Sequence, residues 1–176
     1  MNEKTSPFQV WNEQARQAYQ TGNFILAAQA YGRAAEAATH AGDELTAAEM
    51  KNNQSVAYLR ANQPQAALDA LSGAAEVFAQ AEDYRRLGMT YANRASAWQA
   101  LRRFKEAIRD YERAAEALEK AGEDQLRYEV LKLLSALYLS RLQLLNSVIA
   151  LQAGLAGLKN PTFTQRLMKK LVFLRL

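Results

Sequence analysis

The chain has 176 residues, no cysteine and a formal net charge of +4. The lack of cysteine excludes disulfides, thiolate metal sites and cysteine nucleophiles, and only 8 Gly and 3 Pro indicate a helical composition. No run reaches the roughly 18 apolar residues of a membrane span, and residues 1–10 contain no apolar signal core, so we expect a cytoplasmic protein.

Hydrophobic periodicity predicts four pairs of helices followed by a single helix. The predicted ranges are 8–20 with 24–39, 44–61 with 64–80, 84–100 with 104–120, 124–140 with 144–158, and 161–175 alone. Gly22 supplies a left-handed turn residue between the first two helices. Asn62 before Pro64 and Asn160 before Pro161 combine a capping residue with a proline that tolerates the first helical turn.

A 40-residue repeat runs through these pairs. The residues Phe24, Ala27, Tyr31 and Ala34 return as Phe104, Ala107, Tyr111 and Ala114, with a diverged copy at Pro64, Ala67, Leu71 and Ala74. A repeat of this length is typical of a stacked solenoid, in which each unit buries its apolar face against the next. We therefore expect a binding scaffold rather than an enzyme with a closed catalytic cleft.

The repeated pattern resembles the tetratricopeptide repeat, a helix–turn–helix unit. The resemblance rests on two copies: Trp11, Ala15, Ala18, Phe24, Ala27, Tyr31 and Ala34, and then Tyr91, Ala95, Trp98, Phe104, Ala107, Tyr111 and Ala114. It implies an all-α, right-handed superhelical solenoid. The period of 40 exceeds the usual period of about 34 and is similar to that of cell-polarity adaptors that bind extended peptides.

This resemblance also implies a domain division and a binding face. We expect a repeat domain over 8–158, with repeats at about 8–40, 44–80, 84–120 and 124–158, and a basic amphipathic capping helix over 161–176. In the extended-peptide binders, asparagines at the positions of Asn53 and Asn93 hydrogen-bond the ligand backbone. The predicted groove residues are Asn12, Arg16, Asn52, Asn53, Met89, Asn93 and Ser96. The alternative is a merely solvated concave wall.

The C-terminal quarter differs in charge from the rest of the chain. The last acidic residue is Glu129, and seven basic residues with no acidic one follow it, whereas residues 1–129 hold 15 basic and 18 acidic side chains, a net charge of −3. Residues 142–158 carry no charge, and a stripe of Phe163, Leu167, Leu171 and Leu174 is expected to cover them.

A cap, however, normally has a polar outer face, and here apolar and basic side chains alternate. The candidate interface residues are Arg166, Lys169, Lys170, Val172, Phe173 and Arg175. Three interpretations of this segment stay open: a simple cap, a homodimer or larger-assembly interface, and contact with an anionic membrane surface. Under the second interpretation, the protein is a subunit or assembly factor that docks through residues 130–176.

Other functions are disfavoured. The basic residues are not aligned on one face with stacking aromatics, so nucleic acid is not an expected partner. His40 is the sole histidine, and no hydrolase, nucleotide-binding or zinc-protease motif is present. We therefore expect no catalytic residue, no metal and no cofactor, and we interpret the chain as a protein–protein adaptor whose ligand is a protein or peptide.

Overall fold

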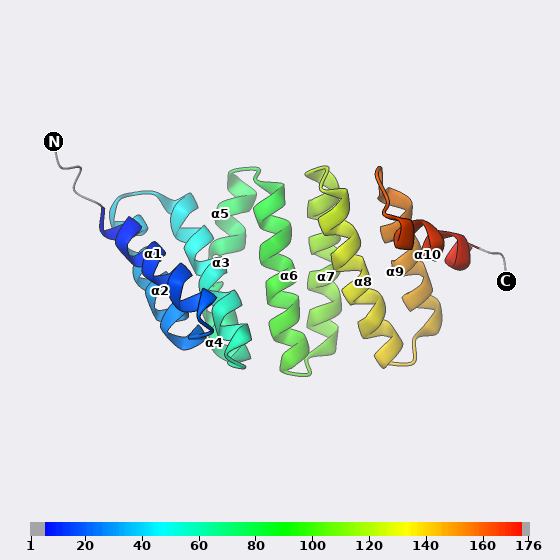
Figure 1. The fold of residues 1–176 in the computed structure, drawn as a ribbon, viewed down its shortest axis with the longest axis horizontal. Coiled ribbons are helices and arrows are strands. Elements are labelled where there is room, and N and C mark those ends of the chain that lie inside the picture. The colour runs from blue at the N-terminus through cyan, green and yellow to red at the C-terminus, as the bar shows by residue number, and fades with distance from the viewer. Residues whose placement is uncertain (1–5, 174–176) are drawn as a thin grey trace.

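The computed structural model describes residues 6–173, which form ten α-helices and no strand (Figure 1). This confirms the predicted all-α repeat solenoid. The helices are α1 (Pro7–Gln20), α2 (Phe24–His40), α3 (Glu44–Arg60), α4 (Pro64–Ala70), α5 (Ala74–Gln80), α6 (Tyr84–Ala100), α7 (Phe104–Lys120), α8 (Asp124–Ser140), α9 (Leu144–Gly157) and α10 (Phe163–Phe173). The hand of the superhelix and the division into a repeat domain and a cap stay predictions.

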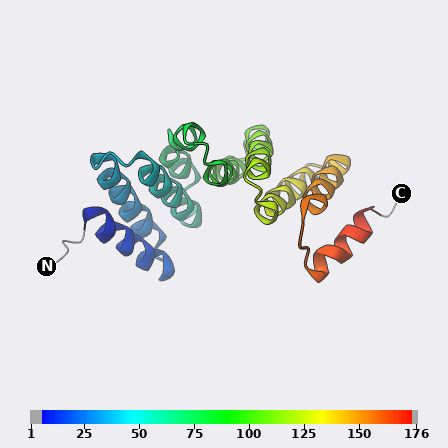
Figure 2. The same cartoon turned by 90° about the horizontal axis from the view of Figure 1, so that it is seen from above.

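The helices stack as antiparallel neighbours in a shallow arch. Figure 2 shows α1, α3, α6 and α8 on the inner side of this arch, and α2, α5, α7 and α9 on its outer side. The structure therefore has one inner face made by the first helix of each pair and one outer face made by the second. A partner that follows the inner face would contact every repeat.

The helix ends have a regular backbone cause. Every twentieth residue from 22 to 142 lies in a tight turn with a positive φ, and the residues are Gly22, Gly42, Asn62, Glu82, Arg102, Gly122 and Leu142. The left-handed conformation stops a helix and lets the chain reverse. The 40-residue repeat is therefore two 20-residue units, each consisting of a helix and a turn.

One predicted helix is wrong. The range 64–80 is not a single helix, because Leu71, Ser72 and Gly73 form a turn between α4 and α5. Gly73 has φ +77°, a conformation that glycine adopts without steric cost. The second pair therefore has a bent outer element, while α7 in the third pair runs straight for 17 residues.

The core follows the alternation of small and large residues. The repeated alanines Ala27, Ala67 and Ala107 are completely buried, and so are their partners Ala34, Ala74 and Ala114. Their small side chains allow helix backbones to approach closely, and Tyr111 and Phe78 fill the space between neighbouring helices. This close packing fixes which side chains face the inner surface.

Candidate functional site

The inner face of the second and third pairs carries a bridge between two asparagines. Asp43 and Asp83 cap α3 and α6 one period apart, each accepting a hydrogen bond from a first-turn backbone N–H. The two helices therefore begin at equivalent positions of the repeat. The Asn93 Nδ2 donates to the Asn52 Oδ1 at 3.0 Å, and Asn52 is buried.

The hydrogen bond between Asn52 and Asn93 determines which polar atoms face the predicted groove. Asn93 is half-buried and uses one N–H on Asn52, so its Oδ1 is the atom left without a described partner. An amide has both donors and an acceptor, as a peptide backbone has. This contact was not predicted from the sequence, although the spacing of 41 residues between Asn52 and Asn93 on adjacent inner helices was a usable signal.

Asn53 lies at a small pocket between the first and second pairs. The pocket has a volume of about 250 Å³ and is lined by Tyr19, Tyr31, Asn53 and Val56. Burial raises the pKa of Tyr31 above its usual value, with the Arg16 charge opposing this rise. The pocket therefore offers two phenol rings, an aliphatic side chain and one amide, which together suit a side chain of mixed polarity.

The remaining predicted groove residues lie on α1 and α6. Asn12 and Met89 are half-buried, and Arg16 is exposed with its Nη1 3.9 Å from the Glu13 Oε2. Such a long, exposed pair contributes little energy, so Arg16 stays available to another anion. Ser96 is tied to the scaffold: its Oγ donates to the Ala92 carbonyl at 3.0 Å and lies 3.2 Å from the Tyr111 hydroxyl.

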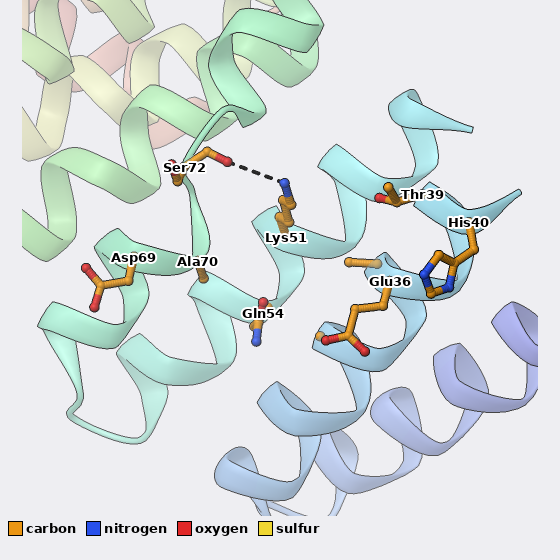
Figure 3. Close-up of a pocket in the computed structure, with 10 residues that line it drawn as sticks. Glu36, Thr39, His40, Lys51, Gln54, Asp69, Ala70 and Ser72 are labelled. Atoms are coloured by element: carbon orange, nitrogen blue, oxygen red, sulfur yellow. Dashed lines mark hydrogen bonds between the residues drawn. The ribbon is translucent and has the colours of Figure 1, made fainter. Parts of the chain in front are cut away.

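A second cleft lies between α2, α3 and α4, where the outer helix is broken (Figure 3). Its volume is about 350 Å³, and its polar lining residues include Glu36, His40, Lys51, Gln54, Asp69 and Ser72. The Lys51 Nζ donates to the Ser72 carbonyl at 3.5 Å. This cleft was not predicted from the sequence, because 64–80 was expected to be one helix; the Ser72-Gly73 pair was the signal for a turn there.

The described residues hold neither a metal site nor a membrane span. No group of three or more His, Cys, Asp or Glu side chains in residues 6–173 is arranged to hold a metal ion. Within the same residues, no helix has the length and apolar character needed to cross a bilayer. The features with recognisable chemistry are therefore the asparagine bridge, the two pockets above, and the exposed surfaces.

A family model named soluble NSF attachment protein, SNAP, matches residues 10–152, which is most of the chain. The chain belongs to the SNAP family. A search of curated proteins gave no match, and a search of solved structures gave none either. SNAP membership agrees with the helical-repeat architecture. The finer prediction that the helix pairs are tetratricopeptide repeats stays a prediction.

The SNAP match ends within α9, so α10 lies beyond it. The predicted packing face of this last helix is wrong. Phe163, Leu167 and Leu171 are 77 %, 50 % and 60 % exposed, while Leu174 lies outside the described residues. Instead, Met168 and Val172 pack on Tyr128, Leu155 and Leu158, and Gln165 is buried. The predicted stripe contained only hydrophobic residues. The observed packed face instead includes the polar residue Gln165, whose side chain donates a hydrogen bond to Gln125 on α8.

The predicted C-terminal interface residues of this SNAP family member are therefore divided. Arg166, Lys170 and Phe173 are exposed, and Lys169 is half-buried. Val172 belongs to the packed face: it contacts the α9 cluster, and its carbonyl accepts a hydrogen bond from the Gln152 Nε2 at 2.9 Å. Arg175 lies outside the described residues. The packed face holds α10 against the C-terminal half of α9, which is the upper half in Figure 1, and leaves the opposite face of α10 exposed.

Proposed function

We propose that this protein is a non-catalytic adaptor that holds a segment of a partner protein along its inner face. Membership of a family of helical adaptors supports this proposal. The observation that carries it is the asparagine bridge between α3 and α6, which presents an amide across two adjacent inner helices. Amides at a regular spacing are better suited to bind a peptide main chain than to bind a small molecule, because a peptide main chain repeats its donors and acceptors.

The name of the family describes soluble proteins that attach to NSF. That name supports a protein as the ligand of this chain. In the proposed complex, the free Asn93 Oδ1 accepts a backbone N–H of the bound segment. Asn53 and Val56 hold one of its side chains at the pocket beside Tyr19 and Tyr31. We further propose that the pairs act as tetratricopeptide-type repeats in the cytoplasm.

Asn12, Arg16, Met89 and Ser96 complete the proposed surface. Arg16 is exposed and only loosely paired with Glu13, so it supplies a charge for an acidic residue of the ligand. Met89 is half-buried and one turn before Asn93 on α6, where it supplies apolar contact. Ser96, with its hydroxyl engaged by Ala92 and Tyr111, shapes the face rather than reaching for the ligand.

The test begins with the full chain as bait in a pull-down, after which the captured protein is identified and its bound segment is prepared as a purified peptide. Asn53→Ala with Asn93→Ala is expected to weaken peptide binding about tenfold or more, since each lost hydrogen bond costs about 1 kcal/mol. Binding is measured by isothermal titration calorimetry. Asn53→Ala alone is also measured because it leaves the Asn52–Asn93 bridge intact.

The matched control removes two amides from the outer helices. Gln29 on α2 and Gln65 on α4 are both exposed, so Gln29→Ala with Gln65→Ala should leave the affinity unchanged. Circular dichroism confirms that each variant keeps its helicity. Equal affinity for the wild-type chain and for both inner-face variants would refute the proposed role of the asparagines.

A further inference from the structure

The N-terminal half of α9, which is the lower half in Figure 1, exposes a dense group of aliphatic side chains together with the turn before it. Leu142, in the turn before the helix, is 85 % exposed, and Leu145 and Ile149 are 72 % and 53 % exposed. Leu144 and Val148 lie on the adjoining face and are also exposed. We call these five residues the lower α9 surface. Contiguous apolar patches of this kind on soluble proteins commonly mark interaction sites.

The preceding repeat shows what normally occupies these positions. Forty residues earlier, Leu145 and Ile149 correspond to the exposed cations Lys105 and Arg109. A solvated outer face has therefore become apolar in the fourth pair. Stability does not explain this change, since the third repeat folds with charged residues at the same places.

In the preceding repeat, a helix covers the face that is equivalent to Leu144 and Val148. Leu144 and Val148 correspond to Phe104 and Ile108, which are partly buried and pack in the cluster that α7 shares with α8. Helix α10 does not take the place of α8 here. It crosses α9 near its C-terminal end (Figure 1), where Met168 and Val172 contact Leu155 and Leu158. The position that a helix fills on α7 is thus open on the lower half of α9.

A basic cleft lies at the turn that precedes α9, where Arg141 and Gln143, the chain neighbours of Leu142, form part of its lining. Its volume is about 400 Å³, and its lining includes Arg102, Arg103, Phe104, Lys105, Arg141 and Gln143. Arg103 pairs with Glu106, and the Arg141 guanidinium stacks over the Phe104 ring at 4.8 Å. Among residues 6–173, Arg102, Lys105 and Arg141 form no salt bridge. The cleft therefore offers uncompensated positive charge next to Leu142.

We propose that the lower α9 surface and this cleft bind an amphipathic helix of a partner protein, whose acidic flank enters the cleft. The apolar stretch from Leu144 to Ile149 covers about 9 Å of helix, so about two turns of partner helix fill it. The internal repeat favours a helix, because α8 covers the equivalent face of α7. Positive charge favours an acidic partner and disfavours a second copy, since two such edges repel each other.

This inference goes beyond the inner-face function and is independent of it. The probe is a capped, dye-labelled 18-residue helical peptide with leucines on one face and glutamates on the other, titrated with the full chain and followed by fluorescence anisotropy. Leu145→Gln with Ile149→Gln is expected to weaken binding about tenfold or more. Arg102→Gln with Lys105→Gln is expected to weaken it and to reduce its dependence on salt.

Two controls localise the binding. Lys169→Gln with Lys170→Gln removes the same charge from α10 and should leave the affinity unchanged. A peptide with lysines in place of the glutamates should not bind. The inner-face variant Asn53→Ala should bind the probe normally, so failure here and failure of the adaptor proposal are distinguishable.

Several results would overturn the inference. One is no saturable binding of the glutamate peptide, and another is binding that the Leu145/Ile149 variant retains. A third is co-sedimentation with vesicles of phosphatidylcholine and phosphatidylserine that this variant abolishes while the peptide fails to bind, because the occupant would then be a lipid surface. A wild-type dimer in sedimentation velocity that the same variant dissociates would assign the surface to a second copy.

Discussion

The ion pair between Arg94 on α6 and Asp110 on α7 should be a major determinant of the stability of the third pair. The Arg94 Nε and Nη2 donate to the two carboxylate oxygens of Asp110 at 2.6 and 2.9 Å. The Asp110 side chain is 5 % exposed and that of Arg94 is 25 % exposed. The guanidinium also lies 5.0 Å from the centre of the Tyr91 ring. Asp110→Asn keeps the shape of this side chain and removes its charge.

The expected cost follows from this burial. Removing one partner of a buried pair typically costs about 3–5 kcal/mol, because the other charge is left without compensation. Arg94 retains some access to water, so we expect the lower end, about 3 kcal/mol, for Asp110→Asn. The assay is urea unfolding followed by circular dichroism, and the double variant with Arg94→Met isolates the coupling energy.

An exposed pair provides the control. Arg85 and Glu123 are 2.8 Å apart, and their side chains are 54 % and 36 % exposed. Exposed pairs contribute about 0–1 kcal/mol, so Arg85→Gln should change the free energy of unfolding by less than about 1 kcal/mol. If Asp110→Asn costs no more than Arg85→Gln, burial does not govern the strength of this pair and the reasoning fails.

Two further predictions concern the fourth pair and the broken helix. Burial and the hydrogen bond to Glu112 raise the pKa of Tyr138 to about 12, so its stabilising contribution is complete below about pH 10 and is lost as the pH rises toward about 12. Tyr138→Phe should therefore reduce the fall of the urea midpoint over this range, and an unchanged fall would contradict the assignment. Gly73→Ala places a side chain at φ +77° and should cost about 1 kcal/mol, seen as a lower melting temperature. Ser72→Ala is its control, and an equal loss in both variants would argue against backbone strain.

The sequence predicted which helices carry the asparagines of the candidate site, but not the contact that these asparagines make. Asn53 and Asn93 were expected on the inner helices, because positions one period apart in a repeat share a face, and Asn52 adjoins the first of them. The direct hydrogen bond between Asn52 and Asn93 was not expected, since it depends on how α3 and α6 approach each other. The cleft at Ser72 was missed because helix periodicity continues across a turn when alanines lie on both sides of it.

The last helix shows the opposite failure. Hydrophobicity selected Phe163, Leu167 and Leu171 as its buried stripe, yet Gln165, Met168 and Val172 form the packed face. A short helix with apolar residues on several sides has no unique buried face in its sequence. The neighbouring helices decide, here through the hydrogen bond between Gln165 and Gln125 and the contact of Met168 with Tyr128.

The sequence by itself determined the repeat, the all-helical class, the helix ends at 84–100 and 104–120, and the loss of acidic residues after Glu129. These features follow from periodicity, turn residues and composition, which are properties of the order of residues along the chain and need no knowledge of how the helices pack. Only the tertiary structure decided that Asn93 meets Asn52, that 64–80 bends at Gly73 into a cleft, and that α10 leaves the lower half of α9 open. Those features depend on contacts between residues distant in the chain, where packing and hydrogen bonding between helices outweigh the preferences of any single helix.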